Sequence, residues 1–302
     1  MKQLYLLVKR NVKIYFKDKG LFISSLITPV ILLVLYATFL KKVYDDSLRS
    51  ALEQAGVAVA DSVVNACVGG QLVSSLLAVC CVTVAFCSNM LMIKDKASGA
   101  IKDLTVTPVK PGTLGLGYFL AALSSTLIVS LIALGASLIY LAAFGWCLTF
   151  GDVMLMLLDV ILLTTFGTAL SSCINFFLSS DGQASAVGTI VSSGYGFICG
   201  AYMPLASFDE GLRNVFACLP GTYGTSIIKD ATLRGVFDEM RSGGSPEEAI
   251  ERIARGVDCK VDFFGVYVST EVSYIVFIAS IILFIGLFVL MNVLSARKRN
   301  KQ

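Results

Sequence analysis

Asp159 is the one carboxylate that lies well inside an apolar stretch of this sequence. An aspartate at the centre of a bilayer costs about 2.5–3.5 kcal/mol on insertion scales, so such a side chain usually faces a cavity or a partner. Asp152 lies about two helical turns away, roughly 10 Å, so Asp159 could also reach the outer headgroups. A role in contacting substrate or protons and a structural hydrogen bond both remain open.

The sequence contains no histidine. This excludes HExxH metal sites, Ser–His triads and histidine-based proton relays. The nine cysteines form no CxxC pair and show no metal-ligand spacing. Cys218 and Cys259 are the two that we expect outside the membrane, and whether they form a disulfide stays open. We therefore predict no catalytic residue, no metal site and no cofactor bound by this chain.

Small residues recur at every fourth position along one apolar stretch. Such a stripe lets another helix backbone approach closely in lipid, where van der Waals contact drives association. The partner helix could belong to a second subunit, line a translocation slit, or be a neighbour in the same bundle. The stripe consists of Ala184, Gly188, Ser192, Gly196 and Gly200.

A short charged segment, residues 94–111, separates two apolar stretches. It begins with Lys94-Asp95-Lys96 and reaches Pro108 through Gly99, in an amphipathic pattern. Composition alone favours a solvated connector. The chain has no GxxxxGK[ST] sequence, so it carries no phosphate-binding loop of that type.

The elements that must position these residues are membrane spans. Hydrophobic residues make up 56% of the 302 residues and charged residues 15%, whereas a soluble domain has about 25% charged residues. A bilayer core needs about 20 apolar helical residues to cross it. The sequence therefore predicts an all-α integral membrane protein with six transmembrane helices. They cover residues 21–40, 72–93, 114–144, 153–178, 184–203 and 272–294.

Basic residues predict the orientation of these spans. The segments at 1–20, 94–111 and 295–302 hold 14 of the 24 basic residues and three acids. The segments on the opposite side of the predicted spans, residues 41–61 and 209–271, hold 10 basic residues and 15 acids. The positive-inside rule then places both termini in the cytoplasm, in agreement with an even number of spans. The net charge of +3 is too small to suggest a nucleic-acid partner.

Two further segments complete the predicted architecture. Residues 1–20 show a helical apolar face that includes Leu7 and Asn11, which indicates a cytoplasmic amphipathic helix on the membrane surface. A structureless basic flank is the alternative. Residues 204–271 are predicted to form a small helical extracytoplasmic segment, with a capping box at Ser207 and Glu210 and a helix over 225–240.

Several motifs resemble those of one known family. The charged turn, the glycine, the apolar pair and the Thr107-Pro108 of the 94–111 segment are similar to the stretch after the second span of ABC-2 type permeases, the membrane subunits of ATP-binding cassette exporters. The order of segments agrees with the family over nearly the full length: the basic helix and proline-bearing first span in 1–40, Gly-Ala-Tyr-Met-Pro at 200–204, and Leu-Pro-Gly-Thr-Tyr-Gly at 219–224 followed by Leu-Arg-Gly at 233–235. The outer region 237–271 is longer than in minimal members.

The resemblance implies partners as well as a fold. It implies a homodimer or heterodimer of permease chains in the cell (plasma) membrane, in contact with lipid, and a cytoplasmic ABC ATPase that binds ATP and Mg. The predicted contacts to the ATPase are Lys94, Asp95, Lys96, Gly99, Ile101, Leu104 and Pro108. The predicted path or dimer-interface residues are Phe86, Asp159, Gly188, Ser192, Tyr195, Gly196 and Gly200.

Export of a drug, antibiotic, lipid-like or other amphipathic compound follows as the expected function. Phe86, Tyr195 and Phe197 favour hydrophobic or amphipathic cargo, but the sequence does not identify it. An ATP-independent secondary transporter or channel is the alternative. It would need ion-coupling groups inside the membrane and paired broken helices, and Asp159 is almost the only such group. An intramembrane enzyme or a scaffold is a third possibility.

Overall fold

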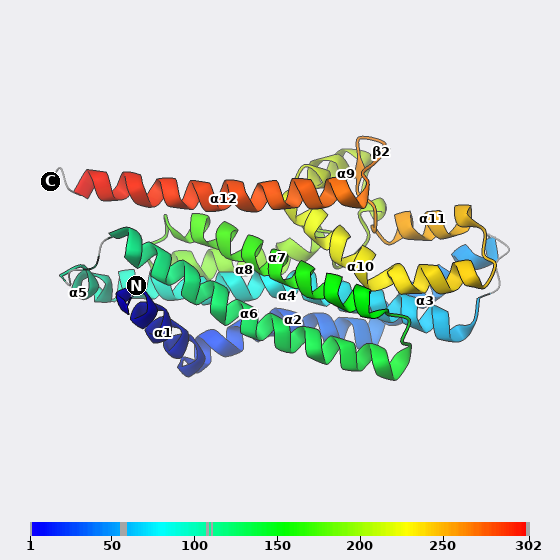
Figure 1. Cartoon of the computed structure of the whole chain (residues 1–302), viewed down its shortest axis with the longest axis horizontal. Helices are drawn as coiled ribbons and strands as arrows, with labels where there is room; N and C mark the ends of the chain where they lie inside the picture. Colours follow the sequence, from blue (N-terminus) through cyan, green and yellow to red (C-terminus); the bar gives the residue numbers. More distant parts are fainter. Residues whose placement is uncertain (1, 55–58, 107–108, 110, 300–302) are drawn as a thin grey trace.

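A computed structural model describes residues 2–54, 59–106, 109 and 111–299. Most of this part is helical, and the helices run roughly along the long axis of an elongated bundle (Figure 1). Both chain ends and α5 lie toward one end of the bundle, while α3 and α11 lie at the other (Figure 1). The helices are α1 (Lys2–Lys17), α2 (Lys19–Leu35), the π-helix η1 (Tyr36–Leu40), α3 (Lys41–Gln54), α4 (Asp61–Ala97), α5 (Ala100–Val106), α6 (Pro111–Phe144), α7 (Phe150–Asn175), α8 (Asp181–Ile198), the 3₁₀ helix η2 (Leu205–Ser207), α9 (Glu210–Ala217), α10 (Pro220–Ser242), α11 (Glu247–Gly256) and α12 (Thr270–Arg299).

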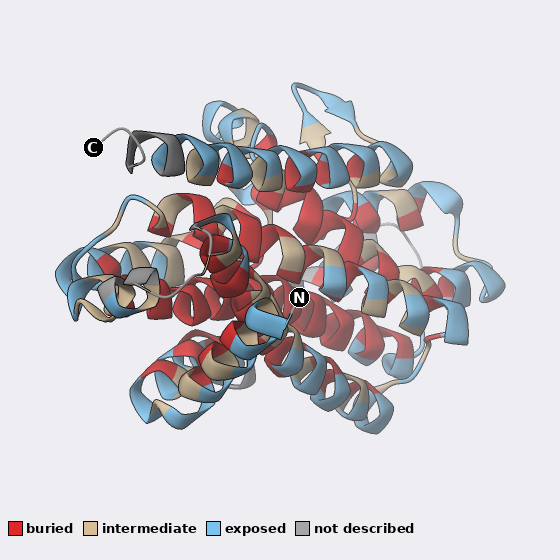
Figure 2. Ribbon diagram, turned by 60° about the vertical axis from the view of Figure 1, so that its left-hand side comes forward, coloured by how far each residue is buried: buried red, intermediate tan, exposed pale blue. Residues whose placement is uncertain are grey.

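The helix α4 is the centre of the bundle. It is apolar on every side. Of its most hydrophobic stretch, 94% is buried, whereas only 22% of the corresponding stretch of α12 is buried. It packs against α2, α6, α7, α8 and α10. Buried residues accordingly concentrate in the middle of the molecule (Figure 2). Close backbone contact supports this packing, since a Cβ added at Gly167 of α7 would lie 2.9 Å from the Cα of Val82.

Five helices in the described part are long and apolar enough to cross a membrane. They cover Lys19–Ser50, Asp61–Ala97, Gly112–Phe144, Phe150–Phe176 and Thr270–Ser295. The helix α8, which overlaps the fifth predicted span, is not one of them, because Asp181, Gln183 and several serines and glycines dilute its apolar residues. The protein is thus an all-helical multi-pass membrane protein, and the six-span count remains a prediction.

Local sequence explains where several helices begin. Asp18 caps α2 by accepting a hydrogen bond from the amide of Leu21 at 3.1 Å. Thr149 and Asp152 form a capping box at the start of α7. Pro29 lies inside α2, and the chain continues through η1 directly into α3, a helix that the sequence analysis did not predict.

The predicted fifth span is too long at its end. It was expected over 184–203, but α8 ends at Ile198. Gly200 follows with a φ of +73°, a left-handed conformation that ends the helix. The next residues turn back toward α8, and the side chain of Tyr202 covers Gly196.

The segment before α12 also differs from the prediction. Ser207 belongs to η2 rather than to a capping box, and Asp209 precedes α9 without a side-chain cap. Pro220 begins the long helix α10, where its missing N–H costs nothing at the first turn. A small antiparallel hairpin, β1 (Asp262–Phe263) and β2 (Val266–Tyr267), follows α11 in a segment that was expected to be helical only.

The helix α1 covers most of the segment predicted to be an amphipathic helix, while its place on the membrane surface stays a prediction, and its buried residues are Leu7, Asn11 and Tyr15. This face packs mainly against α6 rather than lying free. Tyr15 also donates a hydrogen bond to the hydroxyl of Ser25 in α2 at 2.9 Å. Part of the amphipathic pattern therefore reflects packing against the bundle.

Candidate functional site

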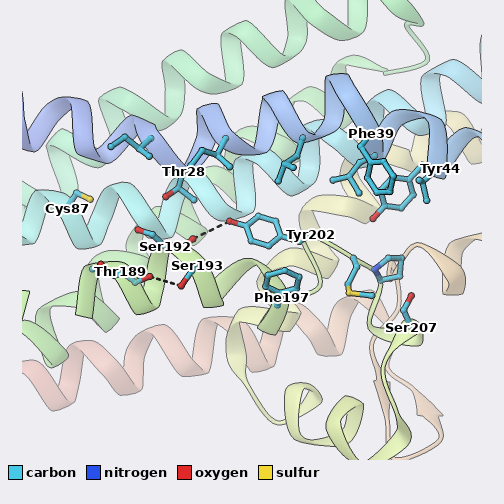
Figure 3. A pocket seen from close by; sticks show the side chains of 18 of the residues that line it. Thr28, Phe39, Tyr44, Cys87, Thr189, Ser192, Ser193, Phe197, Tyr202 and Ser207 are labelled. Carbon is cyan, nitrogen blue, oxygen red and sulfur yellow. Dashed lines mark hydrogen bonds between the residues drawn. The ribbon is translucent and has the colours of Figure 1, made fainter. Parts of the chain in front are cut away.

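A long groove of about 1190 Å³ lies between α2 and α8, and Cys87, Met90 and Lys94 of α4 also line it. Thr28 of α2 lies across from Ser192 of α8, and Tyr202 lies between the two helices farther along (Figure 3). The groove extends from Gly20 to Leu48 on the α2–α3 side. At about 1.5 Å per helical residue this is roughly 40 Å, comparable to the thickness of a bilayer.

The lining of the groove changes along its length. The half near the chain ends carries hydroxyls, and the other half is mostly apolar or aromatic. Among the described residues that line the groove, the charged ones are Lys94 at the first end and Arg252 at the second. The hydroxyls of the first half belong to Ser24, Thr28, Ser185, Thr189, Ser192 and Ser193.

Two aromatic side chains, Phe197 and Tyr202, line the groove where α8 ends. The rings of Phe197 and Tyr202 meet edge to face with centroids 5.0 Å apart. The hydroxyl of Tyr202 donates to the carbonyl of Ser192 at 3.3 Å (Figure 3). A Cβ at Gly196 would collide with the Tyr202 ring, so glycine is what allows the ring to lie against α8.

The small-residue stripe makes several different contacts rather than one. Gly188 faces the terminal methyl of Met90 in α4, Gly196 lies under Tyr202, and Ser192 lines the groove. Ala184 is buried, and Gly200 lies beyond α8 in the left-handed turn. Gly188 and Ser192 also face the open groove, so the stripe is covered by this chain at some positions and open at others.

Three consecutive charged residues at the end of α4 bind three different parts of the bundle. Lys94 forms an ion pair with Asp18 at the start of α2, at 2.8 Å. Asp95 accepts hydrogen bonds from Arg10 of α1 at 2.9 Å and from the hydroxyl of Tyr118 in α6 at 2.6 Å. These bonds join α4 to the first two helices and to α6.

Lys96 completes this cluster. Its ammonium donates to the carbonyl oxygens of Phe176 and Leu178 at 2.8 and 3.1 Å, and it lies 5.6 Å from the centre of the Phe176 ring. It thereby satisfies carbonyls that the end of α7 leaves unpaired. The hydrogen bond with Asp95 raises the pKa of the Arg10 guanidinium, and the bond from Lys94 lowers the pKa of Asp18.

The chain turns sharply after this cluster. Gly99 has a φ of +80°, and a Cβ there would meet open space. The turn leads into α5, on which Ile101 and Leu104 are half-buried and pack against a cluster that includes Leu7 and Leu91. Pro108 lies outside the described residues. The predicted contact residues therefore form two groups. Residues 94–96 are paired with other helices, and the remaining described residues belong to the turn at Gly99, which we call the corner, and to α5.

Five of the seven predicted path residues do not line the groove: besides Gly196 and Gly200, these are Phe86, Tyr195 and Asp159. Phe86 is buried in the central core. Tyr195 is 9% exposed and its hydroxyl faces Gly221 of α10. Asp159 is fully buried between α7 and α12, where Oδ1 accepts a hydrogen bond from Tyr274 at 2.7 Å and Oδ2 has no protein partner in the described part. Phe197, in contrast, lines the groove.

A buried ion pair near the end of α8 was missed by the sequence analysis. Lys229 of α10 is fully buried, and its ammonium donates to the carbonyl of Gly200 at 2.8 Å and lies 3.4 Å from Oδ2 of Asp258. The same oxygen accepts from the amide of Leu205 at 2.8 Å. Burial raises the pKa of Asp258, and Lys229 opposes this rise. No spacing rule signals a pair 29 residues apart.

Cysteines and metals add no second site. Cys218 is exposed and Cys259 is buried, and both are free thiols. Within the described ranges no group of three or more His, Cys, Asp or Glu side chains could hold a metal ion.

Residues 2–233 match the model of the ABC-2 type transporter family. No curated protein matches this chain.

Proposed function

Because the chain belongs to the ABC-2 type transporter family and is a permease of an ABC-type transporter, we propose that it is the membrane subunit of an exporter driven by ATP hydrolysis on a separate subunit. Two such chains, identical or different, would form the path in the plasma membrane, with the termini in the cytoplasm. The observation that carries this proposal is that one end of the groove and the corner at Gly99 belong to the same end of α4.

The groove is the proposed path for cargo. Its α2 wall is poorly covered by the rest of the chain: the most hydrophobic stretch of the span that contains α2 is only 35% buried, and α2 exposes large apolar side chains such as Ile27 and Ile31. Large exposed apolar faces bind lipid or another subunit. A second permease chain that covers this face would convert the open groove into an enclosed path.

The corner at Gly99 is where we propose that conformational changes of the ATPase are transmitted to this chain. A displacement of α5 reaches α4 through a single turn, and the ion pairs and hydrogen bonds of residues 94–96 pass it on to α1, α2, α6 and α7. Nucleotide can shift the equilibrium between two conformations only if it binds one of them better than the other. The proposed ATPase, which would bind ATP and Mg, supplies that difference.

The proposal is tested by breaking the corner. Proline at Gly99 cannot adopt a φ of +80° and removes an amide that donates to Lys96. Gly244 is a matched control, since it has a φ of +82°, open space at its Cβ position and an amide that donates to Arg241.

We expect Gly99→Pro to abolish co-purification with the ATPase or cargo-stimulated hydrolysis, while membrane abundance is kept. Gly244→Pro should leave both intact. Normal coupling in Gly99→Pro would contradict the proposal. ATP-independent transport by this chain alone in liposomes would instead favour a secondary transporter or channel.

A further inference from the structure

The groove between α2 and α8 is amphipathic along its length, and this property restricts what it can hold. Hydroxyl groups and Lys94 line the half nearest the chain ends. Ile31, Leu35 and Phe39 are typical of the other half. An occupant of matching polarity has a polar head at the first end and an apolar body that extends along the second.

The charges of the groove are all of one sign. Lys94 and Arg252 are both basic, and no carboxylate belongs to the described lining. Lys94 forms an ion pair with Asp18, but its side chain remains 44% exposed, and its ammonium group has three protons to donate. Lys17 and Lys19 are exposed beside Asp18, and the exposed Asp181 begins α8. The lysines outnumber the aspartates at this end.

The size and mostly apolar lining of the groove fit a large amphipathic occupant better than a small anion. Pockets for drug-sized ligands have about 300–1000 Å³, and this groove has about 1190 Å³ and a mostly apolar lining. Three of the groove hydroxyls donate their protons to carbonyls of their own helix, as Ser24 does to Leu21 and Thr189 to Ser185. Their oxygens can therefore accept hydrogen bonds from a polar head, while Lys94 supplies the protons for its negative charge.

We propose that the groove binds an anionic amphiphile, a molecule with one negatively charged head group and a long apolar tail, with the head at Lys94 and the tail along Ile31, Leu35 and Phe39. This rests on the proposed function, in which the groove is the cargo path, and it names the class of cargo.

Binding to the purified full-length chain tests this without the ATPase. The probes are tail-labelled lysophosphatidylglycerol, which is anionic, and lysophosphatidylcholine with the same tail, which is zwitterionic. The chain is held in a neutral detergent. We expect the anionic probe to bind about tenfold more tightly, because both probes carry a phosphate but only the phosphatidylcholine head carries a cation that Lys94 repels.

Three variants locate the head group. Lys94→Gln should remove most of the preference for the anionic probe. Asp18→Asn breaks the same ion pair but keeps the cap of α2 and leaves Lys94 charged, so it should bind the anionic probe at least as tightly as the wild type. Arg252→Gln, at the opposite rim, should keep the preference.

The outcomes separate the alternatives. Equal binding of both probes to the wild type would mean that the groove is an ordinary lipid-facing or subunit-facing surface, and would overturn the proposal. A preference that survives Lys94→Gln, or that is lost equally in Asp18→Asn or Arg252→Gln, would overturn the position of the head group. Because no ATPase is present, these results are independent of whether Gly99→Pro uncouples the transporter.

Discussion

The bundle carries charged pairs at both ends, and the two ends are built differently. The Lys229–Asp258 pair is fully to largely buried, with side-chain exposures of 0% and 12%. The Lys94–Asp18 pair is exposed by 44% and 32%. A buried pair that loses one partner leaves an uncompensated charge, whereas a half-exposed pair can exchange a partner for water or a ligand. We therefore expect the end that carries Lys229 and Asp258, the predicted outer end, to be locked in one arrangement, and the end predicted to meet the ATPase to rearrange more easily.

The largest loss of stability is expected at the buried Lys229–Asp258 pair. Lys229→Met should destabilise the protein by about 3–5 kcal/mol, because Asp258 stays buried without its cation and the Gly200 carbonyl loses a donor. Thermal unfolding of the purified chain in detergent measures this. Lys229→Met with Asp258→Asn should recover much of the loss, since the new side-chain amide oxygen could still accept from the amide of Leu205. A single variant as stable as the wild type would contradict a locked outer end.

A smaller effect is expected where α10 touches the loop before α7. The backbone of Gly235 packs directly against the carbonyl of Cys147, and an added Cβ would collide with backbone atoms. Gly235→Ala should cost about 1–3 kcal/mol, as overpacking does. Gly188→Ala is the control, because its Cβ would meet only the flexible end of the Met90 side chain. Equal losses of stability in the two variants would show that the groove side is packed as rigidly as the outer side.

The smallest effect is expected at the exposed pair. Asp18→Asn should change stability by less than about 1 kcal/mol in the same assay. The pKa of Asp18 is lowered by Lys94, so the pair is complete at neutral pH and its small contribution is lost only as the pH falls through that lowered pKa. A loss comparable to that of Lys229→Met would remove the distinction between the two ends.

The sequence predicted the elements better than their contacts. Hydropathy alone located α4, α6, α7 and α12, because apolar stretches of about 20 residues or more are typical of helices that cross a bilayer. It could not predict that α4 is the central helix, since a helix that is apolar all round can face lipid or protein. It also missed α3, whose charged sequence has no hydropathy signal.

The candidate site was predicted in part. The small-residue stripe led to α8, and Gly188 and Ser192 do line the groove with α2. The other wall could not be inferred, because hydropathy does not say which helices are neighbours. Lys94, Asp95 and Lys96 were predicted as ATPase contacts, and their partners Asp18, Arg10 and Phe176 are tertiary contacts that lie 76–85 positions away along the chain. Family resemblance, rather than spacing, connected this segment with function.

The central claim is that the corner at Gly99 faces the cytoplasm while the segment before α12 faces outside. Cys218 is exposed and serves as a native marker for the outer side. Ser98, exposed directly after α4, can be changed to cysteine. In intact cells, a membrane-impermeant maleimide should label Cys218 at once and should label Ser98→Cys only after the membrane is opened. Labelling of Ser98→Cys in sealed cells would place the corner on the wrong side for any ATPase and contradict the account.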